Sequence, residues 1–533
     1  MPHNLPPHDL ENKMKKQPNI LYIMVDQLAA AALPCYGHSI VKAPNISALA
    51  EQGVVFEDAY CNSPLCAPSR FSMMAGQLAS RIGAYDNAAH FSADVPTMAH
   101  YLRAAGYATT LSGKMHFVGP DQRHGFEERL TTDIYPSDYG WTPDWGNFAE
   151  RPTWYHNMLS VVQAGVCETS NQLDFDEEVA HQTVRKIQRL AREADERPFF
   201  LLASFTHPHD PFAITQEYWD RYSDDEIDLP TVAQIPYENL DAHSKRLHHV
   251  SAMSDYAQTE ERIRASRHAY YAMISYIDDK VGQILDALDK SGLRDETIIA
   301  FAADHGEMLG ERGMWYKMSF FDWSARVPMI FHAPDRFAPN RVKEPASLVD
   351  LLPTFVDIAT KKDDEVDDEP MYADPIDGAS LLPLLEQTRN ERERSVYGEL
   401  LGEGAIAPLL MIRRGQYKYI YSEPDPEQLY DMESDPHELE NLAESSLYSF
   451  VRQEFYDEMR KQWDPKTLRE EVIASQRRRR LVDQALRQGQ HAPWDFQPFQ
   501  DASQQYMRNH LDLIVLEKTA RFPSPEIPPP DGG

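Results

Sequence analysis

Cysteine is scarce in this chain. The 533 residues include four cysteines, at positions 35, 61, 66 and 167, and none of them forms the paired Cys-x-x-Cys spacing of a zinc ribbon. A disulfide framework is not expected, because a chain of this length can bury a large apolar core without one.

Long apolar runs are also missing. The longest, such as residues 20–25 and 199–204, have the length of strands, whereas a membrane-spanning helix needs about 20 apolar residues. Residues 1–17 are polar and proline-rich, without the apolar core of a signal peptide. We therefore expect no contact with membranes and a cytoplasmic location.

Positive charge is in short supply. The 52 Lys and Arg residues against 84 Asp and Glu give a net charge of −32, with the 20 His neutral. This charge disfavours nucleic acid as a partner, and it would repel an anionic substrate unless cations gather at one site. The arginine run at residues 477–480 fits a solvated helix face, or a salt-bridged contact between subunits, better than a nucleic-acid site.

The remaining composition, 42% hydrophobic and 26% charged, is that of a globular protein. From residue 18 to 396, strand-like runs alternate with helical patterns, which predicts an α/β fold with a mainly parallel sheet flanked by helices. The predicted strands are residues 19–25, 107–111, 199–205, 297–303 and 327–332. The predicted helices are residues 43–52, 69–79, 98–105, 175–194 and 261–290.

The chain is predicted to divide into a main domain and smaller parts. A flexible leader over residues 1–17 precedes the main α/β domain at 18–396, which includes an acidic loop at 363–369. Strand patterns near residues 409–412, 417–421 and 428–431, with a charged helical pattern at 447–487, predict an antiparallel α+β subdomain over 397–487. Residues 488–533 are predicted to be a C-terminal extension.

Polar residues follow four of the predicted strands: Asp26 and Gln27, Lys114 and His116, His209, and Asp304 and His305. Because the carboxyl ends of parallel strands meet at one edge of the sheet, where ligands bind, we expect these side chains to lie together. A single Asp after a strand is most often a turn residue, but four such strand ends are hard to explain by turns alone.

The strand ends supply ligands for one divalent cation: Asp26, Gln27 through its amide oxygen, Asp304 and His305. Oxygen ligands suit Ca²⁺, Mg²⁺ or Mn²⁺, and the imidazole slightly favours Mn²⁺. Positive charge and hydrogen-bond donors come from Lys114, His116, His209 and Lys317. Together they predict a pocket for a tetrahedral anion in an otherwise acidic protein.

The most specific motif is Cys-Ala-Pro-Ser-Arg at residues 66–70, with Gly76 closing the segment. Pro68 suits the first turn of a helix, so Cys66 would lie at a helix N-terminus, where an anion binds and the pKa of a thiol falls. Arg70 would lie one turn along and could reach the same anion. The motif alone leaves open a buried structural cysteine beside a capped helix.

This motif resembles the Cys-x-Pro-Ser-Arg signature of the type I sulfatases, members of the alkaline phosphatase superfamily in which the cysteine is oxidised to formylglycine. Longer stretches resemble the members of that family that act on choline O-sulfate: residues 63–70, 85–89, 112–121, 124–136, 205–211 and 304–313. The resemblance covers most of the chain. It implies the α/β sulfatase fold, hydrolysis of a small zwitterionic sulfate ester, and a formylglycine-generating enzyme as a partner.

The resemblance also implies that Cys66, once oxidised, acts through its hydrate both as nucleophile and as a ligand of the cation. Many sulfatases have two adjacent carboxylates where this chain has Asp26 and Gln27, and Asp-Asn where it has Asp304 and His305. These departures leave the metal open between Ca²⁺, Mn²⁺ and Mg²⁺.

Five further side chains receive catalytic roles from the resemblance. Arg70 and Lys114 would orient the hydrate and neutralise the sulfate. His116 would be the base that lets sulfate depart and re-forms the aldehyde. His209 and Lys317 would contact the sulfate, and one of them would protonate the leaving oxygen.

A quaternary ammonium group has no hydrogen-bond donor, so aromatic faces and a carboxylate must bind it. The resemblance favours Trp141 and His156, with Asn87 nearby, and Glu399 is the candidate counter-charge. It also implies a homo-oligomer in which the C-terminal extension contacts a neighbouring subunit, with residues 494–495 near that subunit's site.

Three other functions fit part of the sequence. A phosphonate monoester or phosphodiester hydrolase would share the formylglycine site. An anion-binding protein without catalysis would keep Cys66 unoxidised. A redox or thiol enzyme would use Cys66 directly, but it would not explain the cluster of Asp26, Asp304 and His305.

Overall fold

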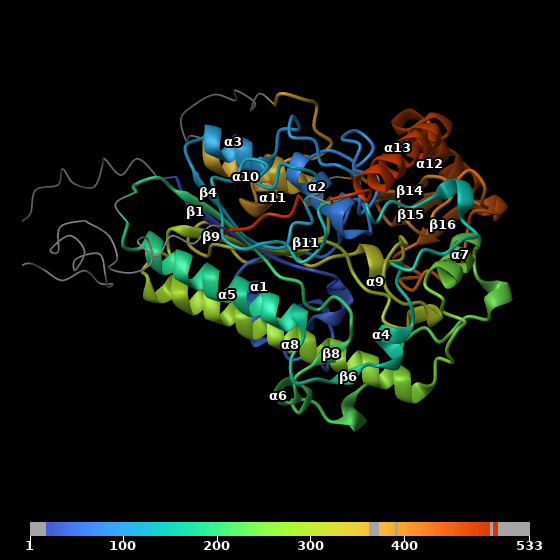
Figure 1. The fold of residues 1–533 in the computed structure, drawn as a ribbon, viewed down its shortest axis with the longest axis horizontal. Coiled ribbons are helices and arrows are strands. Elements are labelled where there is room, and N and C mark those ends of the chain that lie inside the picture. Colours follow the sequence, from blue (N-terminus) through green and yellow to red (C-terminus); the bar gives the residue numbers. More distant parts are fainter. Residues whose placement is uncertain (1–16, 194, 362–371, 390–392, 491–493, 499–533) are drawn as a thin grey trace, which may run out of the picture.

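The computed structural model (Figure 1) describes residues 17–193, 195–361, 372–389, 393–490 and 494–498. The predicted leader up to residue 16, the predicted acidic loop at 363–369 and most of the predicted extension lie outside the described residues. Within the described part of the chain, no helix combines the length and the apolar character needed to cross a membrane.

An eight-stranded sheet forms the centre of the main domain, in the order β11-β2-β10-β9-β1-β7-β4-β5. The run from β9 to β5 is parallel, whereas β10 is antiparallel to both of its neighbours. The strands are β1 (Asn19–Val25), β2 (Val54–Phe56), β4 (Ala108–Gly113), β5 (Glu128–Arg129), β7 (Phe199–Ser204), β9 (Thr297–Ala303), β10 (Met329–His332) and β11 (Asn340–Val342).

Helices cover both faces of this sheet (Figure 1). One face carries α1 (Pro44–Glu51), α5 (Asn171–Leu190) and α8 (Glu260–Lys290), and the other carries α2 (Cys66–Ala75), α3 (Met98–Ala104), α10 (Leu351–Thr360) and α11 (Leu382–Leu385). Every residue of β1, β7 and β9 is buried. These central strands are therefore continuous apolar runs rather than alternating ones, as expected for a parallel sheet covered on both sides.

The predicted α/β architecture with a mainly parallel sheet is confirmed. All five predicted strands and all five predicted helices of the main domain are present; β1 and β9 have the predicted bounds, and the other elements have shifted ends. The strands β2, β5 and β11 were not predicted, because two or three residues are too few to carry a periodic pattern. Gly76 ends α2 in the left-handed region, with φ of 66°.

A small antiparallel sheet follows, formed by β13 (Ser395–Leu400), β14 (Leu409–Arg414), β15 (Tyr417–Tyr421) and β16 (Gln428–Asp431). The boundary predicted at residue 397 falls inside β13, which pairs along its whole length with β14. The fully buried ammonium of Lys418 on β15 contacts Asp322 of the main domain and lies 2.8 Å from Glu438. This buried ion-pair cluster fixes the small sheet against the main domain.

The helices α12 (Ser449–Gln462) and α13 (Pro465–Leu486) complete the C-terminal part, and α13 lies against the main domain near α2 (Figure 1). The predicted helical pattern over 447–487 therefore corresponds to two helices. The shorter elements are β3 (Ala59–Tyr60), β12 (Ala346–Ser347), β6 (Gly165–Val166), β8 (Ala213–Ile214), α4 (Leu159–Val162), α6 (Gln216–Trp219), α7 (Ala242–Val250) and α9 (Asp322–Ala325).

Candidate active site

The carboxyl edge of the central sheet collects the predicted polar residues, together with the start of α2. Asp26 follows β1, Lys114 follows β4, and Asp304 follows β9. Two residues at this edge, Gln27 and His116, adopt left-handed backbone conformations with φ of 61° and 59°. Non-glycine residues rarely adopt this region, and such strain concentrates at functional sites.

Four buried side chains form a candidate metal centre. Asp26, Cys66, Asp304 and His305 each offer one ligand atom, and these atoms all lie within 4.8 Å of one another. Nε2 of His305 lies 3.2 Å from Sγ of Cys66, and 3.6 and 3.7 Å from carboxylate oxygens of Asp26 and Asp304. Nδ1 of the same ring lies 3.0 Å from the carbonyl of Gly306, so it can donate there and leave Nε2 free as a ligand. This donor set fits one divalent cation.

Gln27, predicted as a further ligand, is placed differently. Its amide oxygen accepts a 2.5 Å hydrogen bond from Lys317, and its amide nitrogen donates to Glu307 at 2.5 Å and to Asp210 at 3.2 Å. The amide oxygen is therefore occupied by an ammonium group. The left-handed backbone turns this side chain toward Lys317 and Glu307, whereas its backbone N–H donates to Asp304 at 3.1 Å.

Arg70 and Lys114 bring positive charge to the metal centre, as predicted. Nε of Arg70 donates to Asp304 at 2.7 Å, and its Nη2 lies 3.4 Å from Asp26, which also contacts the ammonium of Lys114. Burial alone would raise the pKa of Asp26, but the charges of Lys114 and Arg70 hold it well below its usual range. Within the described residues, Nη2 of Arg70 has no hydrogen-bond partner and remains a donor for an anion.

The side chain of His116 is buried and makes no hydrogen bond with the described residues. Within the described part of the chain, neither ring nitrogen has a hydrogen-bond partner. Burial, and then the charge of Lys114, lower the pKa of His116 to about 3. The ring is therefore neutral, and neither of its nitrogens is committed to a hydrogen bond with the described residues.

His209 and Lys317 lie next to each other. Nδ1 of His209 donates to the carbonyl of Asp210 at 2.6 Å, so its Nε2 is the acceptor that faces Nζ of Lys317 at 2.8 Å. Burial and the charge of Lys317 lower the pKa of His209 well below its usual range. Burial opposes the charged form of Lys317, but the negative charges of Asp210 and Asp26 raise its pKa. Lys317 is thus the member of the pair that holds the proton.

A cavity of about 190 Å³ opens beside this cluster. His116, His209 and Lys317 line the side toward the metal centre, and the other walls are mainly aromatic: Tyr135, Trp141, Trp154, Tyr155 and His156. The rings of Trp141 and Trp154 are almost parallel, at 13° with centroids 6.2 Å apart. Trp141 and His156 therefore lie where the sequence predicted them, and Asn87 also lines the cavity.

Glu399 does not line this cavity, and its predicted role is corrected. It is a fully buried residue of β13 whose carboxylate accepts hydrogen bonds from the backbone N–H and hydroxyl of Ser80 and from Nε1 of Trp463, at 2.5–2.7 Å. Through these three hydrogen bonds the carboxylate links β13 to Ser80 and Trp463. The side chain is structural.

Glu403, four residues later, lines the cavity instead, as does Asp210. Asn87 donates to its Oε1 at 3.2 Å, while Oε2 has no hydrogen-bond partner among the described residues. Burial, followed by repulsion from Asp86, raises the pKa of Glu403 to about 8. Strand β13 ends at Leu400, so Glu399 lies inside the strand and Glu403 lies in the loop that follows it. Choosing between the two glutamates from the sequence would have required the position of this strand end.

The thiol of Cys66 differs from the sequence expectation in its acidity. Cys66 is the first residue of α2, as predicted, but burial and the charge of Asp26 raise the pKa of the thiol to about 12. Desolvation thus outweighs the favourable helix end. The redox or thiol enzyme also leaves the clustering of Asp26, Asp304 and His305 around Cys66 unexplained.

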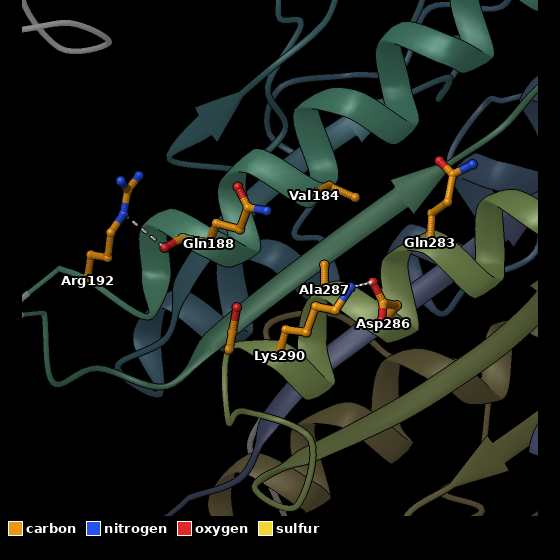
Figure 2. Close-up of a pocket in the computed structure, with 8 residues that line it drawn as sticks. Val184, Gln188, Arg192, Gln283, Asp286, Ala287 and Lys290 are labelled. Atoms are coloured by element: carbon orange, nitrogen blue, oxygen red, sulfur yellow. Dashed lines mark hydrogen bonds and ion pairs between the residues drawn. The ribbon is translucent and has the colours of Figure 1, made fainter. Parts of the chain in front are cut away.

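Figure 2 shows another cavity, of about 480 Å³, between the C-terminal parts of α5 and α8. Both helices end just before β7 and β9 begin, so this cavity lies at the amino edge of the sheet, opposite the metal centre. Lys290 and Asp286 pair across one helical turn there at 2.7 Å. No predicted site residue lines it.

Within the described part of the C-terminal extension, Trp494 and Asp495 contact the main domain of their own chain. The ring of Trp494 meets Tyr139 edge to face at 5.3 Å, and Asp495 accepts a hydrogen bond from the hydroxyl of Ser137 at 3.1 Å. The arginine run at 477–480 is not wholly solvated, because Arg479 is buried in an ion pair with Asp86. Part of the arginine run therefore forms a contact within the chain rather than a solvated helix face.

The family model described as Sulfatase matches residues 18–361. Models of C-terminal regions, described as N-sulphoglucosamine sulphohydrolase and choline sulfatase enzyme, match residues 310–464 and 470–522. Together with the buried metal centre, these matches show that the chain belongs to the sulfatase family of sulfuric ester hydrolases, which confirms the predicted family.

Among curated relatives, the choline-sulfatase of Rhizobium meliloti (strain 1021) is 48% identical over 517 residues, which cover 96% of this chain and 99% of that protein. Among solved structures, the phosphonate monoester hydrolase of Agrobacterium radiobacter has a TM-score of 0.64 and 25% identity, covering 85% of this chain and 96% of that one. A putative sulfatase from Bacteroides thetaiotaomicron has a TM-score of 0.65 and 24% identity, covering 84% and 92%, and shares the fold.

Proposed function

We propose that this sulfatase hydrolyses choline O-sulfate to choline and inorganic sulfate. One observation carries the proposal, namely the two different ends of the cavity. One end is cationic and adjoins the candidate metal ligands, and the other end is aromatic and carries the carboxylate of Glu403. A zwitterionic sulfate ester has the complementary charges at its two ends. The choline-sulfatase of Rhizobium meliloti, at 48% identity over almost the whole chain, supports the same substrate.

Asp26, Asp304 and His305 would hold one divalent cation, Ca²⁺, Mn²⁺ or Mg²⁺, together with residue 66. Cys66 is the position for formylglycine, because its Sγ points into the ligand cluster. The cation supplies charge stabilisation, and the hydrate of formylglycine, made by a formylglycine-generating enzyme, supplies the nucleophilic oxygen. The remaining chemistry falls to other side chains of the chain.

Arg70, Lys114 and Lys317 place three cations around the sulfate position, which offsets the repulsion expected from a net charge of −32. Lys317 holds a proton beside the cavity, so its ammonium is the group that protonates the leaving choline oxygen. His116, neutral and free to accept, takes up the proton that hydrolysis of the sulfo group releases.

The trimethylammonium end would lie among the rings of Trp141, Trp154 and Tyr155, with the carboxylate of Glu403 as its counter-charge. Stacked indoles attract a quaternary ammonium through their faces, and the attraction increases when water is excluded. Glu403 adds a negative charge that attracts a cationic alcohol but has no counterpart in the uncharged ring of an aryl sulfate. The aromatic end therefore selects the alcohol, and the metal end cleaves the ester.

At about pH 9, where Glu403 is mostly charged, replacing it by Gln should raise KM for choline O-sulfate by about 10- to 100-fold with little change in kcat, since the attraction for the cationic end is lost. Steady-state kinetics with 4-nitrophenyl sulfate, a sulfate ester without a cationic group, should show no such change. Glu399→Gln is the matched control, because the same substitution on the same segment lies outside the cavity. An equal rise in KM for the two substrates would contradict the role of Glu403.

The same carboxylate predicts a pH dependence. Its pKa of about 8 means that the charged form, which attracts the cation, increases as the pH rises from about 7 to 9. The ratio of kcat/KM for choline O-sulfate to that for 4-nitrophenyl sulfate should therefore rise over this range and level off above it. Glu403→Gln should remove the rise.

Replacing His116 by Gln should lower kcat by roughly 10²- to 10³-fold while KM changes little, since a proton acceptor is lost after substrate has bound. His124→Gln is the matched control, because His124 is also buried with both ring nitrogens unpartnered among the described residues, but it lies outside the cavity. Similar kcat losses in both variants would show that His116 acts only through packing.

Hydrolysis of phosphonate monoesters is the second candidate, favoured by the Agrobacterium radiobacter enzyme of similar fold. Rates on choline O-sulfate and on a phosphonate monoester, measured side by side, separate the two, and faster turnover of the phosphonate would overturn the substrate assignment. The cytoplasmic location and the homo-oligomer stay predictions. Size-exclusion chromatography with light scattering tests the second.

A further inference from the structure

The buried arginine of α13 makes a two-pronged ion pair with the main domain. Nη1 and Nη2 of Arg479 each lie 2.6 Å from a carboxylate oxygen of Asp86, and both side chains are almost fully buried. Nη1 also donates to the hydroxyl of Thr142 at 3.2 Å. Fork-to-fork pairing of this kind fixes orientation as well as distance.

The two partners of Arg479 stand next to residues of the cavity. Asp86 precedes Asn87, which donates to Glu403, and Thr142 follows Trp141. A single guanidinium therefore ties together the loop that presents Asn87 and the loop that presents Trp141.

A second contact chain runs from α13 to the loop of Glu403. Gln476, one turn before Arg479, accepts a hydrogen bond from the backbone N–H of Trp145 at 3.0 Å. Nε1 of Trp145 donates to the carbonyl of Gly402, the residue before Glu403, at 2.9 Å. A Cβ at Gly402 would lie 3.1 Å from Cβ of Asp86, so this backbone sits directly against the Arg479 ion pair.

Neither Arg479 nor Gln476 lines the cavity, and the metal ligands are held by other elements, namely β1, β9 and α2. The ion pair also neutralises Asp86, whose charge would otherwise add a second anion near Glu403. Arg479 thus influences the end of the cavity that faces the alcohol rather than the end where the ester is cleaved.

We infer that Arg479 is a positioning residue for substrate specificity: through Asp86 and Thr142 it holds the loops that present Asn87, Trp141 and Glu403 to the quaternary ammonium. Selectivity for a cationic alcohol then depends on the C-terminal helix, whereas cleavage of the sulfate ester does not. This inference rests on the proposed function.

The test compares Arg479→Met with Arg477→Met, the same substitution at an exposed position two residues away on α13. Arg479→Met should raise KM for choline O-sulfate by about tenfold or more, with kcat and the kcat/KM for 4-nitrophenyl sulfate within about twofold of wild type. The dissociation constant of choline, measured by calorimetry, should rise by the same factor. Arg477→Met should change none of these values.

Arg479→Met leaves the buried charge of Asp86 without its ion-pair partner, and this variant could fail to fold for that reason alone. Two further variants therefore test the inference independently. The double variant Asp86→Asn with Arg479→Met removes both charges and should show the same loss of selectivity. Arg479→Lys keeps the charge without the fork and should restore part of the affinity for choline.

Equal losses on both substrates, or a lower melting temperature with unchanged selectivity, would show that Arg479 is merely structural and would overturn the inference. A wild-type enzyme without preference for choline O-sulfate would overturn the proposed function and the inference together. A wild-type enzyme with that preference, retained by the folded variants, would overturn the inference alone.

Discussion

Replacing Cys66 by alanine should lower kcat on choline O-sulfate by on the order of 10⁴-fold or more, because the nucleophile is lost. The fold should remain, since the change removes one sulfur from a buried site and leaves the charge network of Asp26, Arg70 and Asp304 in place. The free energy of unfolding is expected to change by about 1 kcal/mol. Steady-state kinetics and denaturant titration measure the two effects.

Cys66→Ser is the sharper comparison, since it keeps a hydroxyl at the same position. A serine that accepted the sulfo group would form a stable ester, so at most one turnover is expected. Mass spectrometry of the wild-type peptide containing residue 66 should show a lighter species, with oxygen in place of sulfur and two hydrogens lost. Retained turnover in Cys66→Ala would refute the nucleophile.

Replacing Asp304 by Asn should reduce kcat/KM by roughly 10³-fold and abolish stoichiometric metal binding, because it removes one of the two carboxylates of the metal centre. It also weakens the ion pair with Arg70, so a loss of about 3 kcal/mol in stability is expected. Elemental analysis of the purified variant and thermal unfolding measure both consequences.

The matched control is Asp278→Asn, a buried carboxylate that accepts hydrogen bonds from the first backbone N–H groups of α1, far from the metal ligands. This variant should lose stability but keep its metal and its activity. Chelation should lower the melting temperature of the wild type and of Asp278→Asn, but not that of Asp304→Asn. A bound metal in Asp304→Asn at wild-type stoichiometry would contradict the assigned ligand set.

The ends of the central strands made the chemistry of this chain predictable. The apolar runs of β1 and β9 stop at Asp26 and Asp304, and parallel pairing of these two neighbours brings both residues to one edge. This physical rule predicts the neighbouring positions of the two carboxylates in the candidate metal centre. The family signature then added Cys66 and Arg70, which periodicity alone would have left as an ordinary capped helix.

Other features depend on tertiary contacts that a sequence pattern does not express. The side chain of Gln27 faces Lys317 because of a left-handed backbone. The acidity of Cys66 reflects total desolvation, which sums contributions from many segments. The choice between Glu399 and Glu403 depended on the last residue of β13, and strand ends are the least predictable part of an element.

The two ends of the cavity differ in their exposure to solvent, and this difference bears on the order in which the two products are released. The metal centre is fully buried, whereas Trp141, Trp154 and Tyr155 at the opposite end remain partly exposed to solvent. In the proposed binding mode, choline lies between the buried metal ligands and the solvent. We therefore expect ordered release, with the alcohol departing first and sulfate following through the aromatic end of the cavity.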